Sequence, residues 1–434
     1  MNTLQLNTTT QHKNKGISLS IDNLIILNFV VLVFFTFFGT KLPFQETGSE
    51  NIFRSETSNI INQILYVFLF LSSMIIVIKR FDTISLFIKK EKYLSLFILL
   101  CLVSAVWSNY HFMSFKRSFQ LLSTYIVVVN ALLFIEPLKL LKVLKIIVLL
   151  YLLVTVFSSL FINEAIDPQF GTWRGIADSK NLLSRVAFYC FLISMFFYVG
   201  QNRLSTKITN YAISFLSVIV IIMSGSSTTV VMLGLIFVIS LLFSIEGIFK
   251  QLRIGRTILI MVLLFIISLY IIVDIFYPTI IYKVPAMLGK DPTLTSRTDI
   301  WAYLWTEVEK KIFLGYGYGT YWIMGSPVLT NLAAAIGFMV NESHNGYLEI
   351  TLQLGLIGIT LFAIILIILI YRIFKLKSNL ALILIVSILI LDYTEATLFK
   401  LGISTLVFIS LYIETSIFYF NQKYSLNFLR GSLY

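Results

Sequence analysis

Residues 342–349, with the sequence ESHNGYLE, gather side chains that could act in acid–base chemistry. They place His344, one of three histidines in the chain, between carboxylates and beside an amide, where a long polar loop meets an apolar run. An imidazole can serve as a base, an acid or a hydrogen-bond donor near neutral pH. The alternative is a histidine that only caps a helix or fixes the loop. We predict that His344 is catalytic and that Asn345, Tyr347 and Glu349 bind substrate.

No metal centre is expected in this segment. No second histidine or cysteine lies near His344 in the sequence, so the usual ligands of a zinc site are missing. Both cysteines, Cys101 and Cys190, lie within apolar runs, which argues against a disulfide framework and against a cysteine-based metal site. We predict that the protein uses no cofactor.

A second polar group lies around residue 180. Ser179 is a plausible N-cap, and Asn181, Ser184 and Arg185 then fall on one helix face. The helix N-terminus adds free N–H groups and partial positive charge, which together suit an anion. The alternative is that Lys180 and Arg185 extend to lipid headgroups, although Arg185 lies about one turn inside an apolar run and would need a partner there. We predict an anion-binding group made of Arg174, Lys180, Asn181 and Arg185.

A third group surrounds Arg297, in residues 289–301 (GKDPTLTSRTDIW). Small hydroxyl residues flank this arginine, and a helix is expected to begin near Asp299. A planar guanidinium in such a setting suits bidentate contact with phosphate or pyrophosphate oxygens. An ion pair between Arg297 and Asp299 or Glu307 is an equally compatible interpretation.

Two further features are ambiguous. Residues 314–322 (LGYGYGTYW) do not match a nucleotide-binding glycine pattern, and we expect a turn that brings Tyr316, Tyr318 and Trp322 to a sugar site or anchors them at the membrane interface. Asp392 and Glu395 end an apolar run and either form a buried polar pair or contribute to the site. We include Glu395 among the predicted substrate-binding residues.

The elements that carry these groups are apolar. The chain is 58% hydrophobic and 12% charged, whereas a soluble domain has about 25% charged residues. About 20 apolar residues cross the hydrocarbon core of a bilayer. We therefore predict an all-α integral membrane protein, with 1–434 forming a single polytopic domain of about twelve transmembrane helices. The expected spans are 22–40, 59–78, 93–107, 119–135, 143–162, 182–199, 208–223, 228–245, 257–274, 347–371, 380–397 and 401–419.

The basic residues predict the orientation. Short cytoplasmic loops are enriched in Lys and Arg, and most basic residues fall into alternate short loops if the N-terminus is inside. Both termini are then cytoplasmic, and residues 275–343 form a large external loop between the ninth and tenth helices. The net charge of +12 is therefore a topology signal, because no basic stripe of the kind that binds nucleic acid is present. The first apolar run lacks a cleavage pattern and is expected to remain as a helix.

The external loop is expected to hold an amphipathic helix from Asp299 to Lys311. Trp301, Leu304 and Val308 recur at helical spacing, with Ile312 one turn further on. We expect this helix to lie on the membrane face.

The motifs resemble, in order, those of the O-antigen ligase and polymerase superfamily, with the greatest likeness to its ExoQ-type exopolysaccharide polymerases. The similar segments are WRGI at 173–176, KNLL at 180–183, DPTLTSRTDIW at 291–301, LGYGYG at 314–319 and SHNGYLEITLQLGLIG at 343–358. They lie within roughly residues 170–400, and the first five helices add only topology.

The resemblance implies a membrane glycosyltransferase of the GT-C kind. Such enzymes take a glycan from undecaprenyl pyrophosphate and pass it to an acceptor hydroxyl, without metal or nucleotide. Arg297 matches the family arginine held to contact the pyrophosphate, and His344 matches the family histidine held to be essential. Ser227, in the turn SGSST at 224–228, departs from the family pattern, which often has a basic residue there. Either a neighbour such as Arg174, Lys180 or Arg185 supplies the second positive charge, or the pyrophosphate is held differently.

We therefore expect a polymerase that joins lipid-linked repeat units of a surface polysaccharide in the bacterial inner membrane, with its active site on the periplasmic face. Its expected partners are undecaprenyl-pyrophosphate-linked oligosaccharides and the lipid bilayer, with a chain-length regulator and a flippase of the same pathway, and no nucleic acid. The alternatives are a ligase that passes polymer to lipid A core or protein, a transporter or flippase, and a non-catalytic assembly partner. A transporter would place ionisable residues and broken helices near the bilayer midplane.

Overall fold

The computed structural model describes residues 15–40, 43–44, 59–197, 204–248 and 294–424. The regular structure of these residues is helical, with fourteen α-helices and two short 3-10 helices at Ser104–Val106 and Asn163–Ala165. The α-helices are α1 (Lys15–Phe38), α3 (Ile60–Lys79), α4 (Phe81–Lys90), α5 (Lys92–Val103), α6 (His111–Phe134), α7 (Pro137–Phe161), α8 (Lys180–Phe196), α9 (Leu204–Met223), α10 (Ser227–Ile248), α13 (Leu294–Lys310), α14 (Pro327–Ile336), α15 (Gly346–Leu376), α16 (Asn379–Thr394) and α17 (Ile403–Tyr424).

Eleven of the twelve expected spans coincide with helices, and the twelfth, 257–274, lies outside the described residues. Six helices are long and apolar enough to cross a membrane: α1, α3, α6, α7, α15 and α17. Others are shorter, and α5 ends after 12 residues in the 3-10 turn that follows it. An all-helical membrane protein agrees with these helices, while the total of twelve spans remains a prediction.

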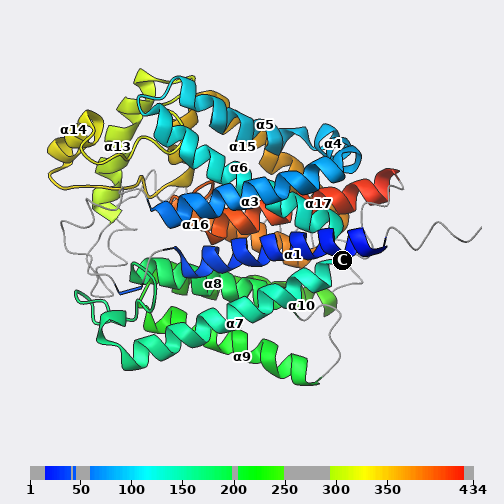
Figure 1. Ribbon diagram of the computed structural model, residues 1–434. Coiled ribbons are helices and arrows are strands. Elements are labelled where there is room, and N and C mark those ends of the chain that lie inside the picture. Colours follow the sequence, from blue (N-terminus) through cyan, green and yellow to red (C-terminus); the bar gives the residue numbers. More distant parts are fainter. Residues whose placement is uncertain (1–14, 41–42, 45–58, 198–203, 249–293, 425–434) are drawn as a thin grey trace, which may run out of the picture.

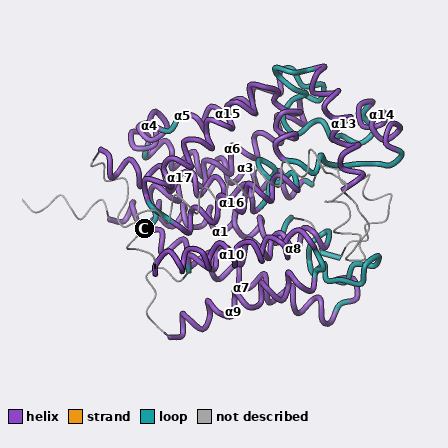
Figure 2. Tube along the Cα trace, turned by 180° about the vertical axis from the view of Figure 1, so that it is seen from behind, coloured by secondary structure: helices purple, strands orange, loops and turns teal. Residues whose placement is uncertain are grey.

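The long helices run side by side along one common direction (Figures 1 and 2). Helices α13 and α14 lie at one end of this bundle, and α4 lies at the opposite end in both views. The basic-loop pattern assigns residues 79–92 to the inside and residues 275–343 to the outside. Helix α4 and the described part of the second segment, residues 294–343, lie at opposite ends, as that topology requires, and the side that each end faces remains a prediction.

The end with α13 and α14 has its own small hydrophobic core. Ile300, Leu304 and Val308 of α13 are buried there with Leu329 and Leu332 of α14. The expectation that this amphipathic helix lies on a membrane face was therefore wrong, because its apolar stripe packs inside the protein. The helix also begins five residues earlier than expected, at Leu294 in place of Asp299.

Helix α15 is broken at Gly355, whose φ of 63° and ψ of −161° are not helical. Residues 312–317 fill the break. The backbone N–H groups of Tyr316 and Gly317 donate to the carbonyls of Leu352 and Gln353, at 3.0 and 2.9 Å. A Cβ atom on Gly355 would lie 2.2 Å from the carbonyl carbon of Phe313, so only glycine permits this approach. The glycine-rich segment is thus locked into α15.

A buried ion pair joins helices at the opposite end of the bundle. Arg372 of α15 lies 2.5 Å from a carboxylate oxygen of Glu91, and both side chains are at most 6% exposed. Ser416 and Tyr412 of α17 bind Arg372 and Glu91 respectively. The pair therefore ties α15 and α17 to the α4–α5 junction.

Candidate functional site

His344 is held in an unusual backbone conformation just before α15. Its φ is 51°, in the left-handed region that costs a non-glycine residue about 1 kcal/mol or more. The neighbours maintain it: Asn345 caps α15 by accepting from the backbone N–H groups of Tyr347 and Leu348. The indole N–H of Trp301 in α13 donates to the carbonyl of Ser343 at 2.8 Å. The loop on either side of His344 is thus fixed by two helices.

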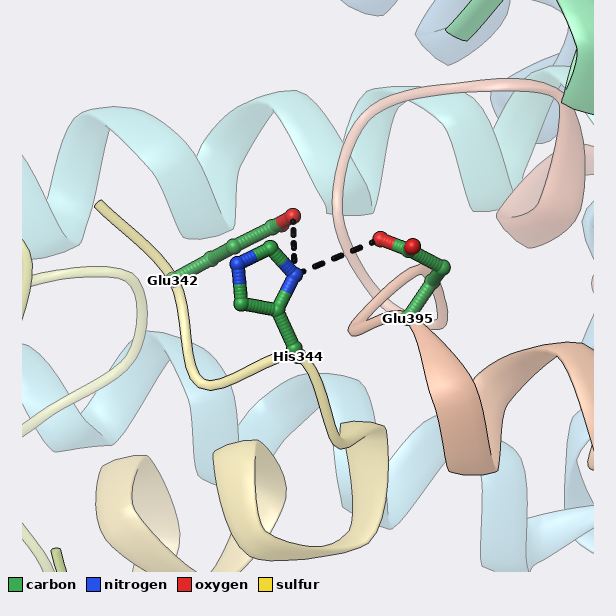
Figure 3. A group of neighbouring side chains, drawn as sticks. All are labelled: Glu342, His344 and Glu395. Carbon is green, nitrogen blue, oxygen red and sulfur yellow. Dashed lines mark hydrogen bonds and ion pairs between the residues drawn. The ribbon is translucent and has the colours of Figure 1, made fainter. Parts of the chain in front are cut away.

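The imidazole of His344 lies between two carboxylates (Figure 3). Its Nδ1 is 3.2 Å from Glu342 Oε1 and 3.5 Å from Glu395 Oε2. Glu342 comes from the same loop, whereas Glu395 comes from the segment after α16, 51 residues further along the chain. Both contacts use Nδ1, so Nε2 lies on the other side of the ring, and none of the described residues hydrogen-bonds it.

Glu395 also contacts two arginines. Arg297 Nη2 lies 3.3 Å from Glu395 Oε1, and Arg185 Nη1 lies 3.9 Å from Glu395 Oε2. The second arm of Arg297 donates to the carbonyl of Thr394 at 2.8 Å. The sequence left open whether Arg297 pairs with Asp299 or Glu307, and the guanidinium pairs with neither: its carboxylate partner is Glu395. One carboxylate therefore brings α8, α13 and the His344 loop together.

Asp392 shapes the turn that carries Glu395. Its Oδ1 accepts from the backbone N–H groups of Thr397 and Leu398, both at 2.8 Å, and the side chain is fully buried. A Cβ atom on Gly346 would lie 2.0 Å from Asp392 Oδ2, so the first residue of α15 must be glycine for the two segments to meet. Asp392 is therefore a structural residue, and Glu395 is the one whose carboxylate reaches the site.

Lys400 completes the cluster, because its Nζ lies 3.0 Å from Glu342 Oε2. Burial disfavours the imidazolium of His344, but the hydrogen bonds and charges of Glu342 and Glu395 outweigh it and raise the pKa of His344 to about 9. Burial likewise opposes ionisation of Glu342, yet His344 and Lys400 hold its pKa below the usual range. The cluster then has a net charge of +2. Its four positive groups are Arg185, Arg297, His344 and Lys400, and its two negative groups are Glu342 and Glu395.

The predicted anion-binding group around residue 180 is only partly assembled. Arg185 joins the cluster through Glu395. The guanidinium of Arg174 donates to the carbonyl of Glu164 at 2.7 Å, and the ammonium of Lys180 lies 3.1 Å from the ring centroid of Phe170. Asn181 is exposed to solvent. Arg185 is thus the one member of this group that contacts Glu395, and the roles of all four residues in anion binding remain predictions.

The predicted binding residues of the ESHNGYLE segment point in different directions. The carbonyl oxygen of the Asn345 side chain is occupied by capping, and the hydroxyl of Tyr347 donates to the carbonyl of Leu389 at 3.0 Å. Glu349 is buried and accepts from Trp322 Nε1 at 2.7 and 2.9 Å. It lines a cavity of about 500 Å³ that also contains Lys400.

The aromatic residues of the glycine-rich segment divide between packing and this cavity. Tyr316 is buried in the core of α13 and α14, and its hydroxyl donates to Glu307 Oε2 at 2.5 Å. Tyr318 and Trp322 both line the cavity. Sequence reasoning missed Lys400, because its partner Glu342 lies 58 residues away.

Three of these groups have the composition of a metal site. One ligand atom each from Glu342, His344 and Glu395 lie within 4.8 Å of one another. Lys400 and Arg297 already pair with these carboxylates. Raising the pKa of His344 to about 9 also disfavours the neutral imidazole that a metal requires. The donor set is therefore better suited to an ion-pair network than to a cation.

Two comparisons with known proteins cover segments that carry part of the cluster. Residues 212–363, which include Arg297 and His344, match the family model described as O-antigen ligase. The chain is 24% identical over 353 residues to the exopolysaccharide production protein ExoQ of Rhizobium meliloti (strain 1021), which covers 78% of this chain and 75% of the relative. The chain is thus similar to the O-antigen ligase and polymerase superfamily, and within it to the ExoQ type.

Proposed function

We propose that the protein is a membrane glycosyltransferase of surface polysaccharide biosynthesis, a polymerase that transfers glycan from undecaprenyl pyrophosphate onto lipid-linked repeat units. The observation that carries the proposal is the assembly of Arg185, Arg297 and His344 on the single carboxylate of Glu395. A net positive cluster at the end of a helix bundle suits a lipid-linked pyrophosphate, which develops negative charge as it departs.

The chemistry follows from the charges. The acceptor hydroxyl oxygen forms a bond with the anomeric carbon of the donor sugar, and the bond from that carbon to the pyrophosphate oxygen breaks. Arg297 and Arg185 stabilise the departing pyrophosphate, which competes with Glu395 for both guanidinium groups and takes up the proton of the hydroxyl. Because its pKa is about 9, His344 is protonated near neutral pH, and it positions substrate by donating from Nε2.

The second candidate is a ligase that passes finished polymer to lipid A core or protein. It is supported by the family model, whose description is O-antigen ligase. The polymerase is favoured by the relative named as an exopolysaccharide production protein. In both reactions the donor site is the same, and the active site is expected on the periplasmic face of the inner membrane.

Transport receives less support. A broken helix such as α15 would suit a transporter if its unwound backbone faced a substrate path. Here residues 312–317 occupy the break, and the carbonyls of Leu352 and Gln353 accept from their backbone N–H groups. The backbone groups at the break are therefore paired with residues 312–317, and the break holds the glycine-rich segment beside the site.

The donor role is tested by Arg297→Lys, which keeps the charge but removes the planar fork. Loss of a charge-stabilising contact costs roughly 2.7–4 kcal/mol, or about 100-fold to 1,000-fold in turnover. The assay is polymer formation from lipid-linked repeat units in proteoliposomes at matched protein level. Lys139→Gln is the control, because Lys139 is a 61% exposed cation on α7 that pairs with Glu136. Near-normal turnover of Arg297→Lys would reduce this arginine to a structural contact.

The acceptor is identified by the glycan profile of cells lacking the gene. A surface glycan reduced to a single capped repeat unit indicates a polymerase. Long polymer that accumulates on its lipid carrier indicates a ligase.

A further inference from the structure

The cavity beside the His344 cluster contains polar groups that the proposed donor chemistry does not use. It has a volume of about 500 Å³, within the range of about 300–1,000 Å³ typical of small-molecule sites. Its walls come from the start of α3, from α6, from residues 318–324, from α15 and from residues 398–401. Lys400 belongs to this wall and also binds Glu342, which contacts His344. Two successive polar contacts therefore connect the cavity with the proposed catalytic histidine.

One wall of the cavity is preorganised. Glu349 accepts from the indole N–H of Trp322, and Gln353 Nε2 donates to Glu349 Oε1 at 2.6 Å. The other end of the Gln353 amide accepts from the backbone N–H of Gly319 at 2.9 Å. This chain of hydrogen bonds fixes the indole ring of Trp322 at the cavity. A fixed aromatic ring beside polar groups suits a sugar, whose ring has apolar faces and polar edges.

A buried donor in the part of the lining that α6 supplies lacks a partner among the described residues. Gln120 of α6 lines the cavity and is 4% exposed, and its Nε2 has no hydrogen-bond partner among the described residues. A buried, unsatisfied amide costs about 1–3 kcal/mol, so such a group calls for a partner that the protein itself does not supply. A hydroxyl or carboxylate oxygen of a ligand in the cavity would accept from it.

The charge of the lining favours an anionic ligand. Lys116 and Arg117 contribute two positive charges, against one negative charge from Glu349, while the charge of Lys400 is offset by Glu342. Arg117 also donates to the carbonyl of Gly319, which places its guanidinium beside the glycine-rich segment. Without Lys400 the lining still carries one more positive than negative charge.

We propose that this cavity binds the acceptor glycan at a sugar that carries an acidic group. The inference rests on the proposed glycosyl transfer and adds the class of acceptor to it. The sugar ring lies against Trp322, the Gln120 amide donates to an oxygen of the ring substituents, and Lys116 with Arg117 binds the acidic group. The acceptor hydroxyl then faces the Lys400 side of the cavity, toward His344.

Binding tests the cavity without any transfer reaction. The probes are two disaccharides that differ only in one group, cellobiouronic acid and cellobiose, added to the full chain in nanodiscs and followed by saturation-transfer NMR. We expect the acid to bind at least about tenfold more tightly than the neutral sugar, since a charge-assisted hydrogen bond contributes about that much. Equal binding of the two, or binding of neither, would overturn the inference.

Two variants assign the binding to the cavity. Lys116→Gln should abolish the preference for the acid. Gln120→Leu removes the unpaired amide but keeps the side-chain volume, and it should weaken the binding of both sugars. Lys139→Gln, outside the cavity, should change nothing. If Lys116→Gln keeps the full preference for the acid and Gln120→Leu binds both sugars as tightly as the parent, the acid binds elsewhere and the inference fails.

Transfer assays separate the two proposals. With lipid-linked acceptor, Lys116→Gln should raise KM about tenfold and leave kcat nearly unchanged, whereas Arg297→Lys should lower kcat. If the protein binds the acid selectively but transfers no glycan, the acidic-sugar site is supported and the proposed glycosyltransferase function is refuted. If transfer is active and KM is unchanged in both cavity variants, the glycosyltransferase function is supported and the acceptor site in the cavity is refuted.

Discussion

Replacing Glu395 by glutamine tests whether His344 is a cation held between two carboxylates. The pKa of His344 is raised from its ordinary value of 6.5 to about 9, which corresponds to about 3 kcal/mol in favour of the imidazolium. Glu342 and Glu395 lie at similar distances from Nδ1, 3.2 and 3.5 Å. The two carboxylates also offset the cost of burying the imidazolium, so if each contributes comparably, removal of the Glu395 charge costs at least roughly 1.5 kcal/mol of this preference. The titration of His344 should then move to lower pH by at least about one pH unit.

The measurement is favourable because the chain has only three histidines. Histidine-selective isotope labelling in nanodiscs gives three imidazole signals, and His344→Gln identifies the one that belongs to the site. Glu136→Gln is the matched control, since Glu136 is a half-exposed carboxylate on the N-terminal side of α7. The reasoning is refuted if the His344 signal titrates near 6.5 in the parent protein, or if Glu395→Gln leaves its midpoint where it was.

The same variant has a consequence for stability. A histidine whose pKa is raised on folding stabilises the protein fully below its unfolded pKa, about 6.5, and loses that contribution as pH rises through about 9. The parent protein should therefore lose thermal stability between these pH values, and Glu395→Gln should lose less over the same window. Glu395→Gln should also be less stable than the parent at pH 6, by about 3 kcal/mol. This is the low end of the cost of breaking a buried ion pair, and we choose it because the side chains of Arg185 and Arg297 are still 18% and 20% exposed.

Three further results are expected. If His344 acts as a protonated donor, transfer activity should fall as pH rises through about 9, and His344→Gln should retain measurable turnover without that fall; activity that instead declines as pH drops toward 6 would indicate a general base. Arg372→Met leaves the buried Glu91 carboxylate without its cation and should destabilise the protein by about 3–5 kcal/mol in chemical unfolding, so an unchanged transition would contradict the pairing. For the topology, an impermeant thiol reagent on intact spheroplasts should label Asn331→Cys and spare Asp82→Cys, both positions being exposed at opposite ends of the bundle and both native cysteines buried; the reverse pattern would invert the orientation.

The helices were accessible from the sequence because a membrane span is defined by its own residues. The apolar runs at 119–135, 143–162 and 347–371 each coincide with long helices, since about 20 apolar residues satisfy both the bilayer and the backbone hydrogen bonds without help from distant segments. The Ser179 N-cap was predicted for the same reason, because capping involves neighbours three residues apart.

The site was only partly accessible from the sequence. Sequence analysis predicted four candidate site residues separately, from their residue types and from their positions at the edges of apolar runs: His344, Arg297, Arg185 and Glu395. It did not indicate that Glu395 would contact the other three, because those contacts join segments 51 to 210 residues apart and depend on how α8, α13, α15 and α16 pack. The charge of His344 follows from that packing, since only the approach of two carboxylates raises the pKa of an imidazole to about 9.

The tertiary structure alone decided the remaining features. An amphipathic stripe such as that of α13 fits a membrane surface or a protein core equally well, and only the presence of α14 beside it selects the core. The break in α15 depends on residues 312–317 meeting Gly355, and the cavity depends on α6, α15 and residues 398–401 lining one common space. Local sequence determines which segments are helical and where charges border apolar runs, because both depend on neighbouring residues. Contacts between charges from distant segments are determined by packing, which no single segment encodes.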